Sequence, residues 1–130
     1  MIRPWADARR RGDVEALRQL LDAGADIDAR DHQNQTALMC AVRDGQLEVV
    51  RLLVARGADL DHAAKYNLTA VMLAVIRGHA EIVRVLMEGG ADVSIRGTGA
   101  PGFAGKSALD LALERGDQGV VTILRQPGNG

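Results

Sequence analysis

Three histidines, one cysteine and one glycine-rich segment are the features of this 130-residue chain that could carry out chemistry. His32 and His62 each follow an aspartate, so the two pairs could hold a metal ion if the fold brought them together. Both pairs lie in short polar stretches, where solvated turn residues are the simpler interpretation. Cys40 lies among apolar residues at helical spacing, which favours a buried small side chain over a nucleophile. We therefore expect no metal, no cofactor and no catalytic residue.

The glycine-rich segment, residues 97–107, ends in Gly105-Lys106-Ser107 and superficially resembles a phosphate-binding loop. The spacing of such a loop requires glycine at position 100, where this chain has Ala100. A phosphate-binding loop also follows a buried strand, and no strand-like run precedes this segment. We interpret the segment as a lengthened turn.

The elements that would position these residues repeat along the chain. Gly24, Gly57 and Gly90 follow one another at intervals of 33 residues. A second set of glycines keeps this interval twice and then shows an interval of 38 residues: Gly12, Gly45, Gly78 and Gly116. A repeat of this length is typical of a solenoid, and the last unit carries about five inserted residues.

Each unit is predicted to be a turn followed by two antiparallel helices. Apolar residues recur at helical spacing over residues 36–44, where Thr36 is placed to be the N-cap and Gly45 to end the helix. Asn34 and Asn67 fall where the turn requires a positive φ. One face of each helix pair is too apolar to be left in water, so the units must stack. We expect one domain over residues 1–130, with repeats at 4–30, 31–63, 64–96 and 97–127 and an inserted loop at 97–105.

The repeat pattern resembles that of the ankyrin repeat family over roughly residues 4 to 126. The fullest match is in unit three: Thr69-Ala70-Val71, Gly78-His79 and Gly90-Ala91-Asp92-Val93. The resemblance implies an all-α, ankyrin-type solenoid of stacked helix-turn-helix repeats joined by short turns, here called fingers. It also implies a structural role for His79 and non-catalytic binding of another protein through the concave surface.

The chain departs from the family pattern in two ways. The family histidine that helps to hydrogen-bond neighbouring turns is replaced at Met39, Met72 and Asp110. Stacking is therefore expected to depend more on packing than on polar contacts between turns. The family asparagine after Gly-Ala-Asp-Val is also replaced, at Asp28, Asp61 and Ser94.

Charge and apolar patterning argue against other kinds of partner. With 16 basic and 17 acidic residues the net charge is −1, which favours neither nucleic acid nor an anionic membrane surface. No run of about 18 apolar residues predicts a membrane span. The first residues lack the apolar segment of a secretory signal and Cys40 is the only cysteine, so a cytoplasmic location is expected. A polar outer face on the first unit favours a monomer: Arg9, Asp13, Glu15 and Arg18.

The family's concave surface, carried over position by position, gives a candidate partner-binding set at the finger tips and the exposed ends of the first helices. Its members are His32, Gln33, Gln35, Arg43, Asp44, Lys65, Tyr66, Leu68, Ile76, Arg77 and Phe103. Tyr66, Leu68 and Ile76 are apolar or amphipathic at positions that usually face solvent, which predicts an anchor for the partner. In the alternative, Leu68 and Ile76 pack locally against the unit-four loop, with Phe103 as a lid.

The predicted function is therefore non-catalytic recognition of a partner protein. Two alternatives stay open: a regulatory or stabilising subunit of an enzyme, and a secreted effector or immunity-type inhibitor of a foreign protein. Catalysis by the chain itself is the weakest alternative and would depend on His32 or His62.

Overall fold

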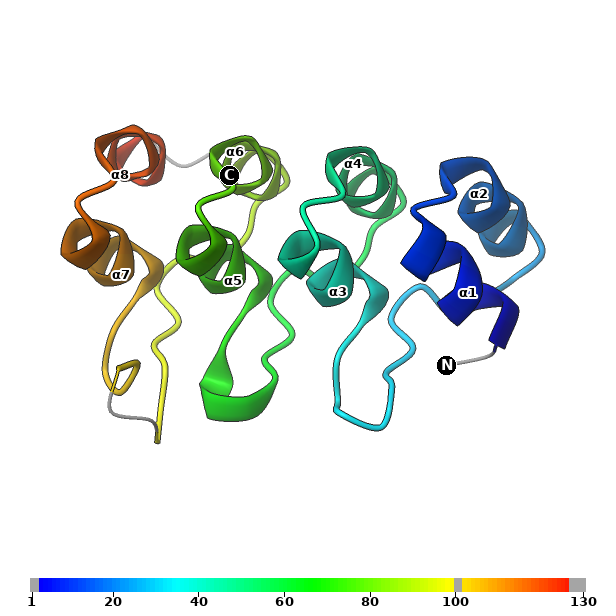
Figure 1. Ribbon diagram of the computed structural model, residues 1–130, viewed down its shortest axis with the longest axis horizontal. Coiled ribbons are helices and arrows are strands. Elements are labelled where there is room, and N and C mark those ends of the chain that lie inside the picture. Colours follow the sequence, from blue (N-terminus) through cyan, green and yellow to red (C-terminus); the bar gives the residue numbers. More distant parts are fainter. Residues whose placement is uncertain (1–2, 100–101, 127–130) are drawn as a thin grey trace.

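The computed structural model describes residues 3–99 and 102–126 as a stack of helix pairs (Figure 1). Ala100 and Pro101 of the expected inserted loop, and Pro127 at the expected end of the last repeat, lie outside the described residues. The described residues form eight α-helices: α1 (Arg3–Arg11), α2 (Val14–Asp22), α3 (Ala37–Arg43), α4 (Leu47–Ala55), α5 (Ala70–Arg77), α6 (Ala80–Glu88), α7 (Ala108–Arg115) and α8 (Gln118–Arg125). The predicted all-helical solenoid is confirmed.

The helices form two layers. The first helix of each pair lies in one row (α1, α3, α5, α7) and the second helix lies in the row above it (α2, α4, α6, α8), as Figure 1 shows. Three fingers project to the same side from the row of first helices (Figure 1). The middle finger contains a short 3₁₀ turn, Lys65–Asn67. No helix of the described residues is both long enough and apolar enough to cross a membrane.

Local sequence signals set the helix boundaries. The Thr36 hydroxyl accepts a hydrogen bond from the backbone N–H of Met39 (3.3 Å), as predicted for an N-cap. Gly45 follows the end of α3 with φ 71°, and Asn34 and Asn67 have φ of 61° and 58°. These predictions are confirmed, and the reason is that each conformation is one that only a few residue types adopt at low cost.

Small and aliphatic side chains fill the core. One alanine in each first helix is fully buried, and its methyl group lets the neighbouring helices approach closely: Ala8, Ala41, Ala74 and Ala112. The second helices contribute buried aliphatic side chains in a matching register: Leu17, Val50, Val83 and Val121. Burial of each such Val or Leu stabilises the stack by about 1.5–3 kcal/mol.

Polar contacts join successive units in addition to the packing of their apolar side chains. The Asp28 carboxylate accepts the backbone N–H of Asp59 (2.9 Å), and the Asp61 carboxylate accepts that of Asp92 (2.8 Å). Met39 and Met72, which replace the family histidine, are buried in the core. The aspartates at the former asparagine positions therefore supply polar links between neighbouring repeats.

Replacing Thr36 by alanine is expected to lower the free energy of unfolding by about 1 kcal/mol, because the N–H of Met39 loses its buried acceptor. Urea denaturation followed by circular dichroism measures the change. Thr122→Ala is the matched control, since Thr122 is exposed and its hydroxyl bonds only to the Gln118 carbonyl within α8. Equal losses in the two variants would contradict the capping role.

Candidate functional site

The first finger presents polar side chains on an ordered backbone. The Asp31 carboxylate accepts the backbone N–H groups of Gln33 (2.8 Å) and Gln35 (3.0 Å), which closes the turn. His32 and Gln33 are exposed at its tip, and Gln35 is half-buried. This finger therefore offers its tip to solvent in a conformation that is already fixed.

A polar network connects this finger to the ends of α1 and α3. Arg43 donates from Nη1 to the Gln35 side-chain oxygen (3.0 Å) and from Nε to Asp44 (3.3 Å). The other oxygen of Asp44 accepts from Arg9 Nη1 (3.4 Å). Cys40 Sγ lies 3.5 Å from the same Gln35 oxygen. The sequence-predicted residues Gln35, Arg43 and Asp44 are thus brought together.

The ring of Tyr66, on the second finger, contacts the third finger. Tyr66 is 38% exposed, has φ 63° and lies under the Lys65 ammonium group, which is 5.0 Å from the ring centroid. The Phe103 ring is 6.2 Å away, centroid to centroid. The carbonyl of Tyr66 also accepts the backbone N–H of Thr98 (2.7 Å). Tyr66 and Phe103 therefore join two fingers and still leave part of the tyrosine ring open.

Two of the three residues expected at the anchor are less exposed than the sequence suggested. Leu68 is only 9% exposed and belongs to the hydrophobic core, so its expected exposure is wrong. Ile76 is half-buried against the same core, while Arg77 beside it is exposed. The physical reason is that the finger folds back toward α5 after Asn67, which turns Leu68 inward.

Two of the histidines considered for metal binding or catalysis make contacts between repeats. His62 donates from Nε2 to the Asn34 carbonyl on the neighbouring finger (2.9 Å). His79 precedes α6, and its ring lies so near Gly45 that a Cβ there would approach His79 Cε1 to 3.0 Å. Among the described residues no group of three His, Cys, Asp or Glu could hold a metal ion. His62 and His79 thus contact a neighbouring repeat, whereas His32 is exposed at the finger tip.

Cys40 is buried, as predicted, and lies at the floor of a pocket beside the first finger. Burial is the main cause that raises the pKa of its thiol, and the neighbouring Arg9 and Arg43 guanidinium groups only partly oppose it. A thiol with a raised pKa is a weaker nucleophile at neutral pH, because less of it is thiolate.

The structure also places Arg9 elsewhere than the sequence predicts. It was expected on the outer face of the first unit, yet it is buried against unit two. Its counterparts one and two repeats on are Val42 and Val75, both in the core. This register comparison is the signal that could have found it, since an arginine occupies a position that is otherwise apolar.

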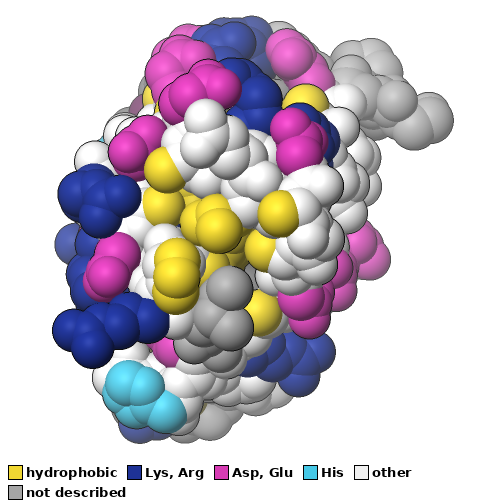
Figure 2. Space-filling model, turned by 90° about the vertical axis from the view of Figure 1, so that its right-hand side faces the viewer, with side chains coloured by type: hydrophobic (Ala, Val, Ile, Leu, Met, Phe, Trp, Pro, Cys, Tyr) yellow, Lys and Arg dark blue, Asp and Glu magenta, His cyan; other side chains and the backbone are white. Residues whose placement is uncertain are grey.

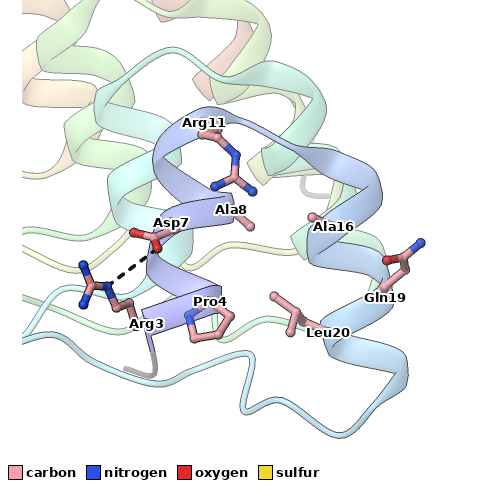
Figure 3. A pocket seen from close by; sticks show the side chains of 8 residues that line it. All are labelled: Arg3, Pro4, Asp7, Ala8, Arg11, Ala16, Gln19 and Leu20. Atoms are coloured by element: carbon pink, nitrogen blue, oxygen red, sulfur yellow. Dashed lines mark ion pairs between the residues drawn. The ribbon is translucent and has the colours of Figure 1, made fainter.

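The N-terminal end of the stack carries a different hollow, of about 550 Å³. Figure 2 shows apolar side chains at the centre of this end with charged side chains around them. Figure 3 shows that Pro4, Ala8, Ala16 and Leu20 line it between α1 and α2. Gln19 is exposed where unit two has the buried Leu52, a replacement that suits contact with water. This hollow is therefore the end face of the stack, away from the fingers.

Together these features define a class of protein: a solenoid of finger-bearing helix pairs in which each unit is covered by its neighbours. The family model for ankyrin repeats in three copies matches residues 6–97 and 64–129. The chain therefore belongs to the ankyrin repeat family, whose members generally bind other proteins. A comparison with curated proteins finds no match.

Cys40 is expected to react with iodoacetamide at pH 8 about 100-fold more slowly, or slower still, in the folded chain than in urea, because alkylation requires opening of the core. Mass spectrometry of the alkylated chain over time gives both rates. Glutathione treated in parallel controls for the effect of urea on the reagent. Rapid labelling of the folded chain would show an accessible thiolate instead.

Proposed function

We propose that this chain is a non-catalytic recognition protein that binds a partner protein through its concave surface. The surface consists of the finger tips and the adjoining ends of the first helices, with Leu68 supporting it from beneath. Its members are His32, Gln33, Gln35, Arg43, Asp44, Lys65, Tyr66, Ile76, Arg77 and Phe103. The observation that supports the proposal is that the fingers carrying His32, Gln33, Lys65, Tyr66 and Phe103 are already linked to one another.

The links between fingers reduce the entropy lost on binding. The His62–Asn34 contact joins the first finger to the second. The Asn67 side-chain amide donates to the Arg96 carbonyl (2.9 Å) and joins the second finger to the third. Because the backbone of the surface is ordered before the partner arrives, less of the contact energy is lost in ordering it.

The second finger supplies the chemistry expected of a binding centre. Tyr66 combines an apolar ring with a hydroxyl, and the Lys65 cation lies over that ring. Lys65 and Arg77, the last residue of α5, are both exposed. Tyrosine and arginine dominate the residues that contribute most to protein–protein affinity. The partner is therefore expected to present an apolar residue with acidic neighbours to this unit.

The double substitution Lys65→Glu/Arg77→Glu is expected to weaken partner binding about tenfold or more, because it reverses two exposed charges on the concave surface. The matched control is Arg51→Glu/Arg84→Glu, which makes the same change in net charge on α4 and α6. The partner is first isolated by affinity purification with the unaltered chain and then titrated, as a purified protein, by isothermal calorimetry.

The control variant is expected to bind within about twofold of the unaltered chain, and both variants are checked for unchanged melting temperature. If the purified partner binds the concave variant normally and the control variant poorly, the partner uses the second helices. That result would overturn the proposed surface.

A further inference from the structure

A pocket of about 380 Å³ lies where α1 and α3 meet the first finger. We call it the arginine pocket because four arginines are among the residues that line it: Ala6, Arg9, Arg10, Arg30, Asp31, His32, Gln33, Cys40 and Arg43. It opens beside the tip of the first finger and so forms part of the concave surface. Its cationic lining distinguishes it from the hollow at the N-terminal end, which Pro4, Ala8, Ala16 and Leu20 help to line.

The cations of this pocket outnumber the carboxylates that pair with them. Arg9 and Arg43 share the single carboxylate of Asp44. Arg10 pairs with Asp7 on the exposed side of α1. With Arg30, four guanidinium ions line the pocket, and the carboxylates of Asp7, Asp31 and Asp44 lie in it or beside it, which leaves one positive charge in excess.

The Asp31 carboxylate lines the pocket and is already counted in that balance. Its Oδ1 already accepts two backbone N–H groups of the finger. Those donors hold the carboxylate in the turn, where it shapes the finger. The pocket thus keeps a local positive charge although the chain as a whole carries a net charge of −1.

Arg9 is the least satisfied of these cations. Its side chain is only 10% exposed, and its one described ion pair, to Asp44, spans 3.4 Å. Its Nε has no hydrogen-bond partner among the described residues. A buried guanidinium with an unused donor is costly. The exposed Arg10 and half-buried Arg43 at the same pocket are the guanidinium groups that a ligand oxygen can reach with a charge-assisted hydrogen bond.

We propose that the arginine pocket binds one carboxylate side chain, Glu or Asp, of the partner protein. The proposal rests on the proposed function, because it assigns this pocket to the same concave surface. A single carboxylate matches the single excess charge, and its two oxygens suit the planar fork of a guanidinium. A phosphate dianion fits less well, because the carboxylates of Asp7, Asp31 and Asp44 lie beside the pocket and repel it.

The pocket is particular to the first junction of the stack. One repeat further on, the positions of Arg9, Arg43 and Cys40 are held by Val42, Ile76 and Leu73. The corresponding place at the second junction therefore has no arginine, and Val42 there is fully buried.

The probe for this site is N-acetyl-glutamate N-methylamide, with N-acetyl-glutamine N-methylamide as its neutral counterpart. Titration into the ¹⁵N-labelled chain at constant low ionic strength is followed by NMR. The glutamate compound is expected to shift the backbone amides of residues 9–10, 31–33 and 43 saturably, with a dissociation constant of about 1–20 mM for one charge-assisted contact. Raising NaCl from about 50 to 500 mM is expected to weaken the binding, since screening acts on the partly exposed charges.

The double variant Arg10→Gln/Arg43→Gln is expected to weaken glutamate binding at least fivefold. The matched control, Arg51→Gln/Arg84→Gln, removes two exposed arginines from the second helices and is expected to leave it unchanged. If the double variant does not fold, the single variant Arg10→Gln is used, because Arg10 is largely exposed.

Three results would overturn the proposal. Equal shifts from the glutamine compound would show that charge is irrelevant, and equal losses in the control variant would show only a general effect of net charge. Stronger saturable shifts from inorganic phosphate at the same residues and ionic strength would assign the pocket to phosphate groups. None of these measurements uses the partner. The proposed carboxylate site can therefore be overturned without overturning the proposed concave surface, and the concave surface can be overturned without overturning the carboxylate site.

Discussion

The structure depends on one constraint: no helix pair of this chain can bury its own apolar faces. Each pair has a buried alanine on its first helix and a buried aliphatic residue on its second, and both faces are covered only by neighbouring pairs. Because every unit is covered in the same way, the same residue types recur every 33 residues. The stack therefore needs few aromatic residues, and the fully buried Trp5 packs where units two and three have Leu38 and Val71.

The same stacking also fixes the conformation of the segments between the units. Packing sets the distance between units, and at that distance one aspartate carboxylate reaches the backbone of the next unit, as Asp28 reaches Asp59. Ser94 stands at the third aspartate position, where its side chain and backbone N–H both bond to the Asp92 carboxylate. These two hydrogen bonds hold the pKa of Asp92 below its ordinary value. Contacts that hold the repeats together thus also order the segments that lead into the fingers.

The sequence predicted the parts of the fold that are local or periodic. The Thr36 cap and the positive φ of Asn34 could be predicted because each depends on one residue type in its own turn. The burial of Leu68 could not, because it depends on how the finger returns to α5. The contact of Tyr66 with Phe103 joins residues 37 positions apart across a loop of irregular length, so no periodicity predicts it. Of the three residues expected at the centre of the candidate surface, Tyr66 is exposed as predicted, whereas Leu68 is buried and Ile76 is half-buried.

Arg9 shows where such predictions fail and why the failure is informative. Periodicity assigns its position to the core, whereas residue type assigns an arginine to the surface, and the structure buries it. A buried cation that breaks the repeat register destabilises the stack unless other groups compensate it. Asp44 compensates it only in part, since it also pairs with Arg43 and leaves Nε of Arg9 without a partner. In a protein whose stability comes from repetition, a residue that breaks the register against stability marks the place where the proposed carboxylate site can be tested first.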